Sequence, residues 1–158
     1  MGTYDRARNA RFILSFDCEG KWGMADDPAM ASDNPISGDS LTKAYTQIFE
    51  ILERHKIPAT FALVGLFAGG YEQYLESRGE LLDSEPHRNW LEVHERSFAA
   101  GNHDGWFYPE LINQIKARGI HEIASHSFTH LPLYNVGVME ESFLTEMKLV
   151  NQWKEKSS

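Results

Sequence analysis

Two hydrophobic patterns alternate in the first part of the chain. Residues 12–18 form a short, mostly apolar run, and residues 59–64 form a second one. Runs of this kind predict buried strands. Between them, apolar positions recur with the i, i+3, i+4, i+7 spacing of an amphipathic helix, which Asp39 or Ser40 is placed to cap. These positions are Leu41, Ala44, Tyr45, Ile48, Phe49 and Leu52. Two apolar strands joined by a helix indicate a βαβ unit in a covered parallel sheet.

The rest of the chain predicts mainly helices. The helical segments are residues 71–82, 86–99, 109–118 and 139–154. The last of them places four large apolar side chains on one face, namely Phe143, Met147, Val150 and Trp153. Residues 120–125 predict a third strand after a glycine that closes the preceding helix. The long interval between the second and third strands leaves room for a fourth strand around residues 90–93.

Composition limits the class of protein. With 158 residues, of which 42% are hydrophobic, the chain is long enough for one core, so we expect a single domain over residues 1–158. A formal net charge of -8 would repel a phosphate backbone, so nucleic acid is not an expected partner. The apolar run near the N-terminus is too short for a signal peptide or a membrane span. The sequence as written therefore predicts a cytoplasmic protein, or an exported one if a leader has been removed.

Two polar clusters follow strand-like runs. Asp17 and Glu19 share one face of the first strand, because side chains alternate along a strand. The opposite face, expected to meet the helices, carries Phe12, Leu14, Phe16 and Cys18. Cys18 is therefore predicted to pack as a small apolar side chain. His126 and His130 follow the third strand, and a helical turn beginning at residue 126 would place both imidazoles on one side.

Ligands of parallel α/β proteins gather at the carboxyl ends of strands, so we expect the two clusters to meet. Two imidazoles and one carboxylate, with a position left for water, form the donor set of catalytic zinc. A second carboxylate beside that water is placed to act as its base. The alternative is that the two histidines are ordinary surface residues near the start of a helix.

The chain resembles the polysaccharide deacetylase family (NodB homology domain, carbohydrate esterase family 4). Residues 15–20, Ser-Phe-Asp-Cys-Glu-Gly, match its first motif, usually Thr-Phe-Asp-Asp-Gly. Residues 126–130, His-Ser-Phe-Thr-His, match its His-Ser/Thr-x-x-His motif, and residues 57–61 resemble its second strand. The resemblance implies a distorted (β/α) barrel. It also implies a metal-dependent hydrolase that removes N-acetyl groups from an amino-sugar-containing saccharide.

The same resemblance implies a role for each matching residue. Asp17 would be the catalytic base, and Glu19, His126 and His130 would bind one divalent ion, in the first place Zn²⁺, with Co²⁺, Ni²⁺ or Mn²⁺ as alternatives. Unlike the family's adjacent acidic pair, the two acids here are separated by Cys18.

The family's later motifs supply an arginine, an aromatic wall and a histidine acid, and none of them has a match here. We therefore expect the N-terminal part of the domain, an incomplete barrel with little activity alone. An unclosed barrel edge would favour self-association. Two alternatives to the deacetylase remain. One is a catalytically incomplete metal-binding remnant or interaction module, and the other is an amidohydrolase-type relative that acts on a non-sugar amide.

Further residues have both a functional and a structural interpretation. Trp22 could stack on a sugar face or pack within its loop. His103 lies with Asp104 in a glycine-flanked turn and could reach substrate or belong to the turn. The remaining histidines are predicted to lie on helix surfaces or pack against strands, namely His55, His87, His94 and His121. Three further aromatic residues are predicted to be core, namely Trp90, Trp106 and Phe107.

Overall fold

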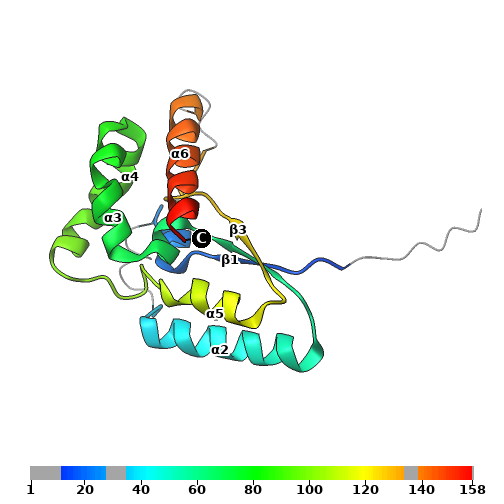
Figure 1. The fold of residues 1–158 in the computed structure, drawn as a ribbon. Coiled ribbons are helices and arrows are strands. Elements are labelled where there is room, and N and C mark those ends of the chain that lie inside the picture. The colour runs from blue at the N-terminus through cyan, green and yellow to red at the C-terminus, as the bar shows by residue number, and fades with distance from the viewer. Residues whose placement is uncertain (1–11, 28–34, 134–138, 158) are drawn as a thin grey trace, which may run out of the picture.

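The protein has a mixed α/β architecture that is mostly helical (Figure 1). A computed structural model describes residues 12–27, 35–133 and 139–157. In chain order the elements are β1 (Ser15–Cys18), η1 (Gly20–Met24), α2 (Gly38–His55), β2 (Thr60–Leu63), α3 (Gly65–Asp83), α4 (Glu85–Ala99), α5 (Glu110–Arg118), β3 (Glu122–Ser125) and α6 (Met139–Ser157). The three strands and the five helices predicted from the sequence are therefore present.

The strands form one parallel sheet in the order β1-β2-β3. The predicted βαβ unit is confirmed, because α2 connects the parallel neighbours β1 and β2. Within the described residues the sheet has three strands and does not close, so the expected barrel is not seen. Both outer strands have an edge without a partner strand in this part of the chain. The expected self-association through such an edge stays a prediction.

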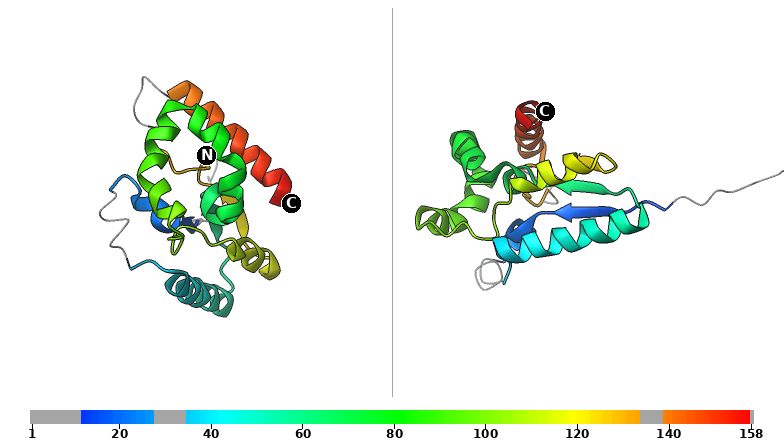
Figure 2. Two further views of the ribbon diagram at one scale, coloured as in Figure 1. Left: turned by 90° about the vertical axis from the view of Figure 1, so that its left-hand side faces the viewer. Right: turned by 60° about the horizontal axis from the view of Figure 1, so that its bottom comes forward.

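Both crossover helices cover the same face of the sheet. A right-handed crossover that always steps in one direction places each connecting helix on the same side. Accordingly, α2 and α5 lie along one side of the strands (Figures 1 and 2). The N-terminus of α2 is capped by Ser37, whose side chain accepts a hydrogen bond from the Ser40 N–H, rather than by the predicted Asp39 or Ser40. Ser40 completes the capping box by bonding back to the Ser37 N–H.

The covered face of the sheet carries the apolar side chains, as predicted for β1. Phe16 stacks on Phe61, and Cys18 is fully buried, which confirms its predicted packing role. Phe12 was expected on the same face, but it is 81% exposed. The reason is that the ladder begins only at Leu14, whose carbonyl accepts the Thr60 N–H. The opposite face of the sheet is made of small or polar residues, namely Ser15, Asp17, Thr60, Ala62, Glu122 and Ala124.

The predicted fourth strand around residues 90–93 is wrong, because these residues lie within α4. The buried side chains of α4 recur every three or four residues, which is a helical period. They are His87, Leu91, His94 and Phe98. The helix predicted over residues 86–99 is thus confirmed, but two of the residues on its inward face are histidines, which a search based on apolar residues does not find.

The inward face of α6 also differs from the prediction. Val150 and Trp153 are buried as expected, but Phe143 and Met147 are 50% and 43% exposed. The side chains of Ser142, Glu146 and Leu149 are buried in their place. A buried carboxylate is tolerated only where hydrogen bonds satisfy it. The helix is therefore oriented by a polar residue that apolar periodicity cannot reveal.

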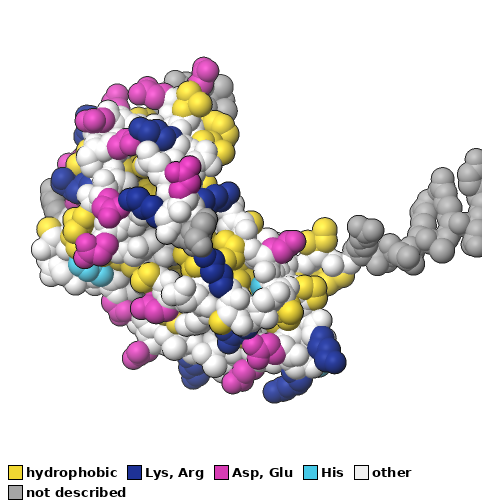
Figure 3. Space-filling model, in the orientation of Figure 1, with side chains coloured by type: hydrophobic (Ala, Val, Ile, Leu, Met, Phe, Trp, Pro, Cys, Tyr) yellow, Lys and Arg dark blue, Asp and Glu magenta, His cyan; other side chains and the backbone are white. Residues whose placement is uncertain are grey.

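Acidic and basic side chains are interspersed on the face shown in Figure 3, and apolar side chains gather toward the right-hand end of the described chain. Among the described residues, the most exposed large hydrophobic side chains are those of Phe12 and Ile13, at 81% and 82%. Across the described ranges, no helix combines the length and the apolar character needed to cross a membrane.

Candidate metal centre

The side chains of Glu19, His126 and His130 converge on one point. Glu19 Oε2 lies 3.3 Å from His126 Nε2 and 2.9 Å from His130 Nε2. One ligand atom from each residue lies within 4.8 Å of the others. The three side chains are 27% to 34% exposed, so the cluster is open to solvent on one side. A search of the described residues for three or more histidine, cysteine or acidic side chains that could hold one metal ion finds this one group.

Strand ends bring the three residues together. Glu19 directly follows β1, and its φ of -135° and ψ of -14° take the chain out of the strand and into η1. His126 directly follows β3, and its N–H donates to the carbonyl of Leu63 at 2.8 Å. The prediction that residues at the carboxyl ends of β1 and β3 would meet is therefore confirmed by the geometry.

The predicted helical turn at residues 126–130 is wrong. Ser127 and His130 have φ values of 67° and 61°, in the left-handed region that a right-handed helix excludes. The segment is instead a tight loop, closed by the His130 N–H donating to Ser127 Oγ at 3.0 Å. The loop still brings the two imidazoles together, with ring centroids 5.0 Å apart.

The contact between Glu19 and His130 shifts the pKa values of both side chains, in opposite directions. The hydrogen bond from His130, more than any other contact, holds the pKa of the Glu19 carboxyl below its ordinary value. The same bond raises the pKa of His130. Metal binding requires neutral imidazoles and an ionised carboxylate. A divalent cation would therefore take the place of the hydrogen bond that His130 otherwise makes to Glu19.

Trp22 contributes through its backbone rather than its ring. The indole is fully buried, donates to the carbonyl of Trp106 at 2.9 Å and meets that indole edge-on at 5.0 Å. The idea that this ring stacks on a sugar is therefore corrected to loop packing. The Trp22 backbone also raises the pKa of the His130 imidazole, and a polar contact of this kind orients metal-binding histidines.

His103 is also accounted for by its turn. Its ring stacks on Tyr71 at 3.8 Å, and its Nε2 is hydrogen-bonded to the carbonyl of Phe98 at 2.9 Å. The neighbouring Asp104 carboxylate accepts the Gly38 N–H at the start of α2 at 2.6 Å. These contacts favour the structural interpretation of His103, since the face of its ring and its Nε2 atom both have partners within the chain.

Asp17 lies on β1 with its side chain exposed, opposite the small Ala62 of β2. Its carboxylate is not a member of the three-residue ligand group. The structure thus separates the two acids of the first motif: Glu19 is in contact with the histidines, and Asp17 is an open carboxylate on the uncovered face of the sheet.

Among the remaining histidines, His121 packs between strands as predicted, accepting the Ala59 N–H through Nδ1 at 3.3 Å. His87 and His94 are 0% and 3% exposed, so neither lies on a helix surface. Both face the interior from α4, and His87 contacts Glu146 of α6 at 3.0 Å. No sequence motif pointed to the contact between His87 and Glu146, because these two residues lie 59 positions apart in the chain.

The sequence model of the polysaccharide deacetylase family matches residues 33–156. This match covers well over half of the chain, and the chain belongs to that family. The matched range includes His126 and His130 and begins after the Asp17–Glu19 segment. No curated protein matches the chain. No solved structure matches it either. Family membership identifies the protein as a hydrolase of the carbohydrate deacetylase type.

Gly23 makes room for Glu19, a role that its place in the loop after the first motif did not reveal. A Cβ at this position would lie 2.0 Å from Glu19 Oε1 and 2.5 Å from its Cδ. We expect Gly23→Ala to displace the carboxylate and lower the affinity for Zn²⁺ roughly 10-fold or more, as changes around metal ligands commonly do. The measurement is a competition titration of Zn²⁺ against a chromophoric chelator.

Gly79→Ala on α3 is the matched control, because a Cβ there meets nothing within 4 Å. This substitution should leave metal affinity unchanged and add about 0.5–1 kcal/mol to the free energy of unfolding, since alanine favours the helix over glycine. If the two variants bind Zn²⁺ equally well, the assigned position of Glu19 is incorrect.

Proposed function

We propose that this protein is a metal-dependent hydrolase that removes N-acetyl groups from an amino-sugar-containing saccharide. A single observation carries the proposal. In a chain of the polysaccharide deacetylase family, Glu19, His126 and His130 present one carboxylate oxygen and two imidazole nitrogens to a common point at the strand ends. All of residues 1–158 are assigned to this one domain, in keeping with the single hydrophobic cluster of the described residues.

The donor set fits one divalent ion, with Zn²⁺ as the first candidate. Imidazole nitrogen and carboxylate oxygen both suit Zn²⁺, and three protein ligands leave the open position that distinguishes catalytic from structural sites. Co²⁺, Ni²⁺ and Mn²⁺ are alternatives with the same ligands. Glu19, His126 and His130 would hold the ion, and the contact between His130 and the Trp22 backbone would orient that imidazole.

When bound, the ion supplies Lewis-acid chemistry: it lowers the pKa of water and polarises the acetamide carbonyl. Asp17 acts as the general base and takes one proton from the attacking water. The water oxygen forms a bond to the carbonyl carbon, and the bond from that carbon to nitrogen breaks. The new oxygen leaves in acetic acid, which ionises to acetate in solution. The proton that Asp17 took passes, directly or through solvent water, to the sugar nitrogen, which leaves as the free amine.

The test is metal removal and restoration. We expect about one divalent ion per chain after purification, loss of acetate release from an N-acetylglucosamine oligosaccharide on chelation, and recovery on adding Zn²⁺ or Co²⁺. Elemental analysis and an enzymatic acetate assay provide the two readouts. Stoichiometric metal without release of acetate from any amide would indicate the catalytically incomplete metal-binding remnant or interaction module instead. Release only from a non-sugar amide would indicate the amidohydrolase-type alternative. A chain that binds no ion would refute the metal-dependent proposal.

A further inference from the structure

The carboxylate of Glu146 is buried against the loop that carries the two histidines. Glu146 lies in the middle of α6 and is 2% exposed. Glu146 Oε2 accepts the N–H of Phe128 at 2.5 Å and that of Thr129 at 3.1 Å. The Thr129 hydroxyl donates to Oε1, and His87 Nε2 lies 3.0 Å from the same oxygen. One side chain from α6 thus accepts hydrogen bonds from Phe128 and Thr129, which lie between His126 and His130.

These hydrogen bonds satisfy groups that have no partner in regular secondary structure. Because residues 126–130 form neither helix nor strand, their N–H groups must be paired elsewhere or hydrated. The N–H groups of Phe128 and Thr129 point to Glu146, and Phe128 and Thr129 are both fully buried. A buried carboxylate needs several donors in turn, and this loop and His87 provide them.

The carbonyl groups of the same loop are held by the start of α3. Gly65 N–H donates to the Ser127 carbonyl at 3.1 Å, and Leu66 N–H donates to the Phe128 carbonyl at 2.9 Å. A Cβ at Gly65 would lie 2.4 Å from the Phe128 ring, so the approach is close. The loop is therefore fixed from two sides: α3 donates hydrogen bonds to the loop's carbonyl groups, and Glu146 of α6 accepts hydrogen bonds from the loop's N–H groups.

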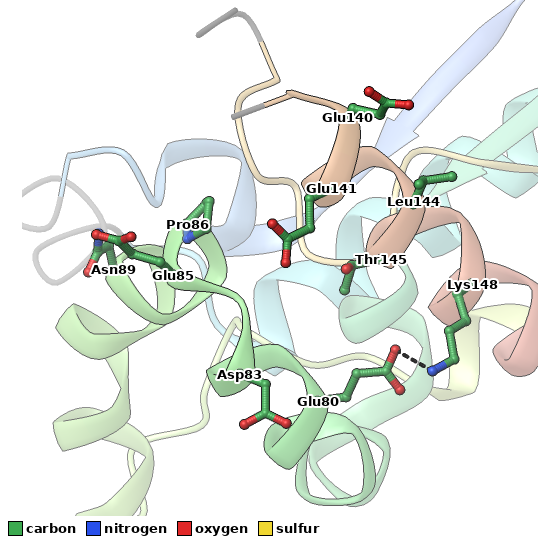
Figure 4. A pocket seen from close by; sticks show the side chains of 10 residues that line it. All are labelled: Glu80, Asp83, Glu85, Pro86, Asn89, Glu140, Glu141, Leu144, Thr145 and Lys148. Atoms are coloured by element: carbon green, nitrogen blue, oxygen red, sulfur yellow. Dashed lines mark ion pairs between the residues drawn. The ribbon is translucent and has the colours of Figure 1, made fainter. Parts of the chain in front are cut away.

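Glu146 is itself held in place. His87 is fully buried, and its Nδ1 lies 2.8 Å from Ser84 Oγ, so Nε2–H is the side that donates to Glu146 when Nδ1 accepts the hydroxyl. Helix α6, which carries Glu146, is linked to α3 by the ion pair between Lys148 and Glu80, at 2.9 Å. Both residues of this ion pair line a groove of about 1040 Å³ (Figure 4). Glu146 is not among the residues that line this groove.

We propose that Glu146 is a positioning residue of the metal centre. It acts through the backbone of Phe128 and Thr129 to keep Ser127 and His130 in their left-handed conformation, and so keeps both imidazoles aimed at Glu19. The inference rests on the proposed function, because it concerns the geometry of the same metal ligands. It adds a residue that contacts neither the ion nor the substrate.

The experiment compares Glu146→Gln with Glu141→Gln, a control on the exposed side of the same helix. Glutamine keeps the size of the side chain but turns one acceptor oxygen into an NH₂ group that faces donors. We expect Glu146→Gln to lower Co²⁺ affinity roughly 10- to 100-fold and to change the visible absorption spectrum of bound Co²⁺. Glu141→Gln should match the wild type in both. A merely stabilising residue would lower the melting temperature without altering the Co²⁺ spectrum at temperatures where the variant is folded.

Thr129→Val and Thr129→Ser test the same contact if Glu146→Gln does not fold. Valine removes the hydroxyl that donates to Glu146, and serine restores it, so only the valine variant should show weaker Co²⁺ binding and an altered spectrum. Wild-type affinity and spectrum in Glu146→Gln, or in Thr129→Val where the first does not fold, would overturn this inference and leave the proposed function standing. Absence of stoichiometric Co²⁺ binding by the wild type would overturn both.

Discussion

Asp17→Asn is expected to reduce acetate release by about 100-fold or more while leaving the metal content of the chain unchanged. Asparagine has nearly the same shape as aspartate but cannot take a proton from water. Asp17 lies outside the ligand group of Glu19, His126 and His130, so the ion should stay bound. The measurement is the rate of deacetylation of an N-acetylglucosamine oligosaccharide together with elemental analysis of the same samples.

Asp83→Asn provides the control, because Asp83 is an exposed acid at the end of α3 and away from the strand ends. It should retain wild-type turnover and metal content. Loss of the ion from Asp17→Asn would mean that Asp17 and Glu19 have been given each other's roles. Full activity in that variant would exclude Asp17 as the base.

His126→Ala should remove the bound ion. Structural zinc sites gain about 10–16 kcal/mol from their four ligands together, which is about 2.5–4 kcal/mol for each and corresponds to a factor on the order of 100 to 1,000 in affinity. Removing one of three protein ligands should therefore leave little metal after dialysis against a weak chelator. Because metal activation of water is then lost, deacetylation should fall with it.

His55→Ala is the matched control for this prediction, since His55 is an exposed histidine in the last turn of α2. Its metal content should equal that of the wild type. Equal stoichiometry in His126→Ala and His55→Ala, after adventitious ions have been removed, would contradict the ligand assignment. Thermal unfolding of both variants in the presence of chelator shows whether the change in metal content reflects the site or the fold.

The sheet could be predicted because its signals are local. Apolar runs at residues 12–18 and 59–64 predicted strands, and the helical spacing between them predicted α2. The parallel arrangement followed, since strand–helix–strand units pair in this way. The exposed Phe12 was missed because strand pairing starts only at Leu14, and nothing in the apolar run shows where a partner strand begins.

Both α4 and α6 were predicted as helices, but the side chains that they bury were predicted only in part. The same physical reason applies to both. In both helices, buried polar side chains take positions that periodicity assigns to apolar residues. His87 and Glu146 face the interior together, while Phe143 and Met147 are turned outward. A carboxylate and an imidazole can be buried when each satisfies the other, and their pairing depends on two helices that are far apart in the sequence.

The sequence by itself determined the chemistry available at the site. It specified two imidazoles and two carboxylates, and the rule that such groups gather at the carboxyl ends of parallel strands put Glu19 near His126 and His130. Only the tertiary structure decided how they meet. The histidines converge through a left-handed loop rather than a helical turn, and donors and acceptors from α3 and α6 hold that loop. Backbone groups outside helices and strands take whatever partners the fold brings to them, and no local pattern in the chain encodes those partners.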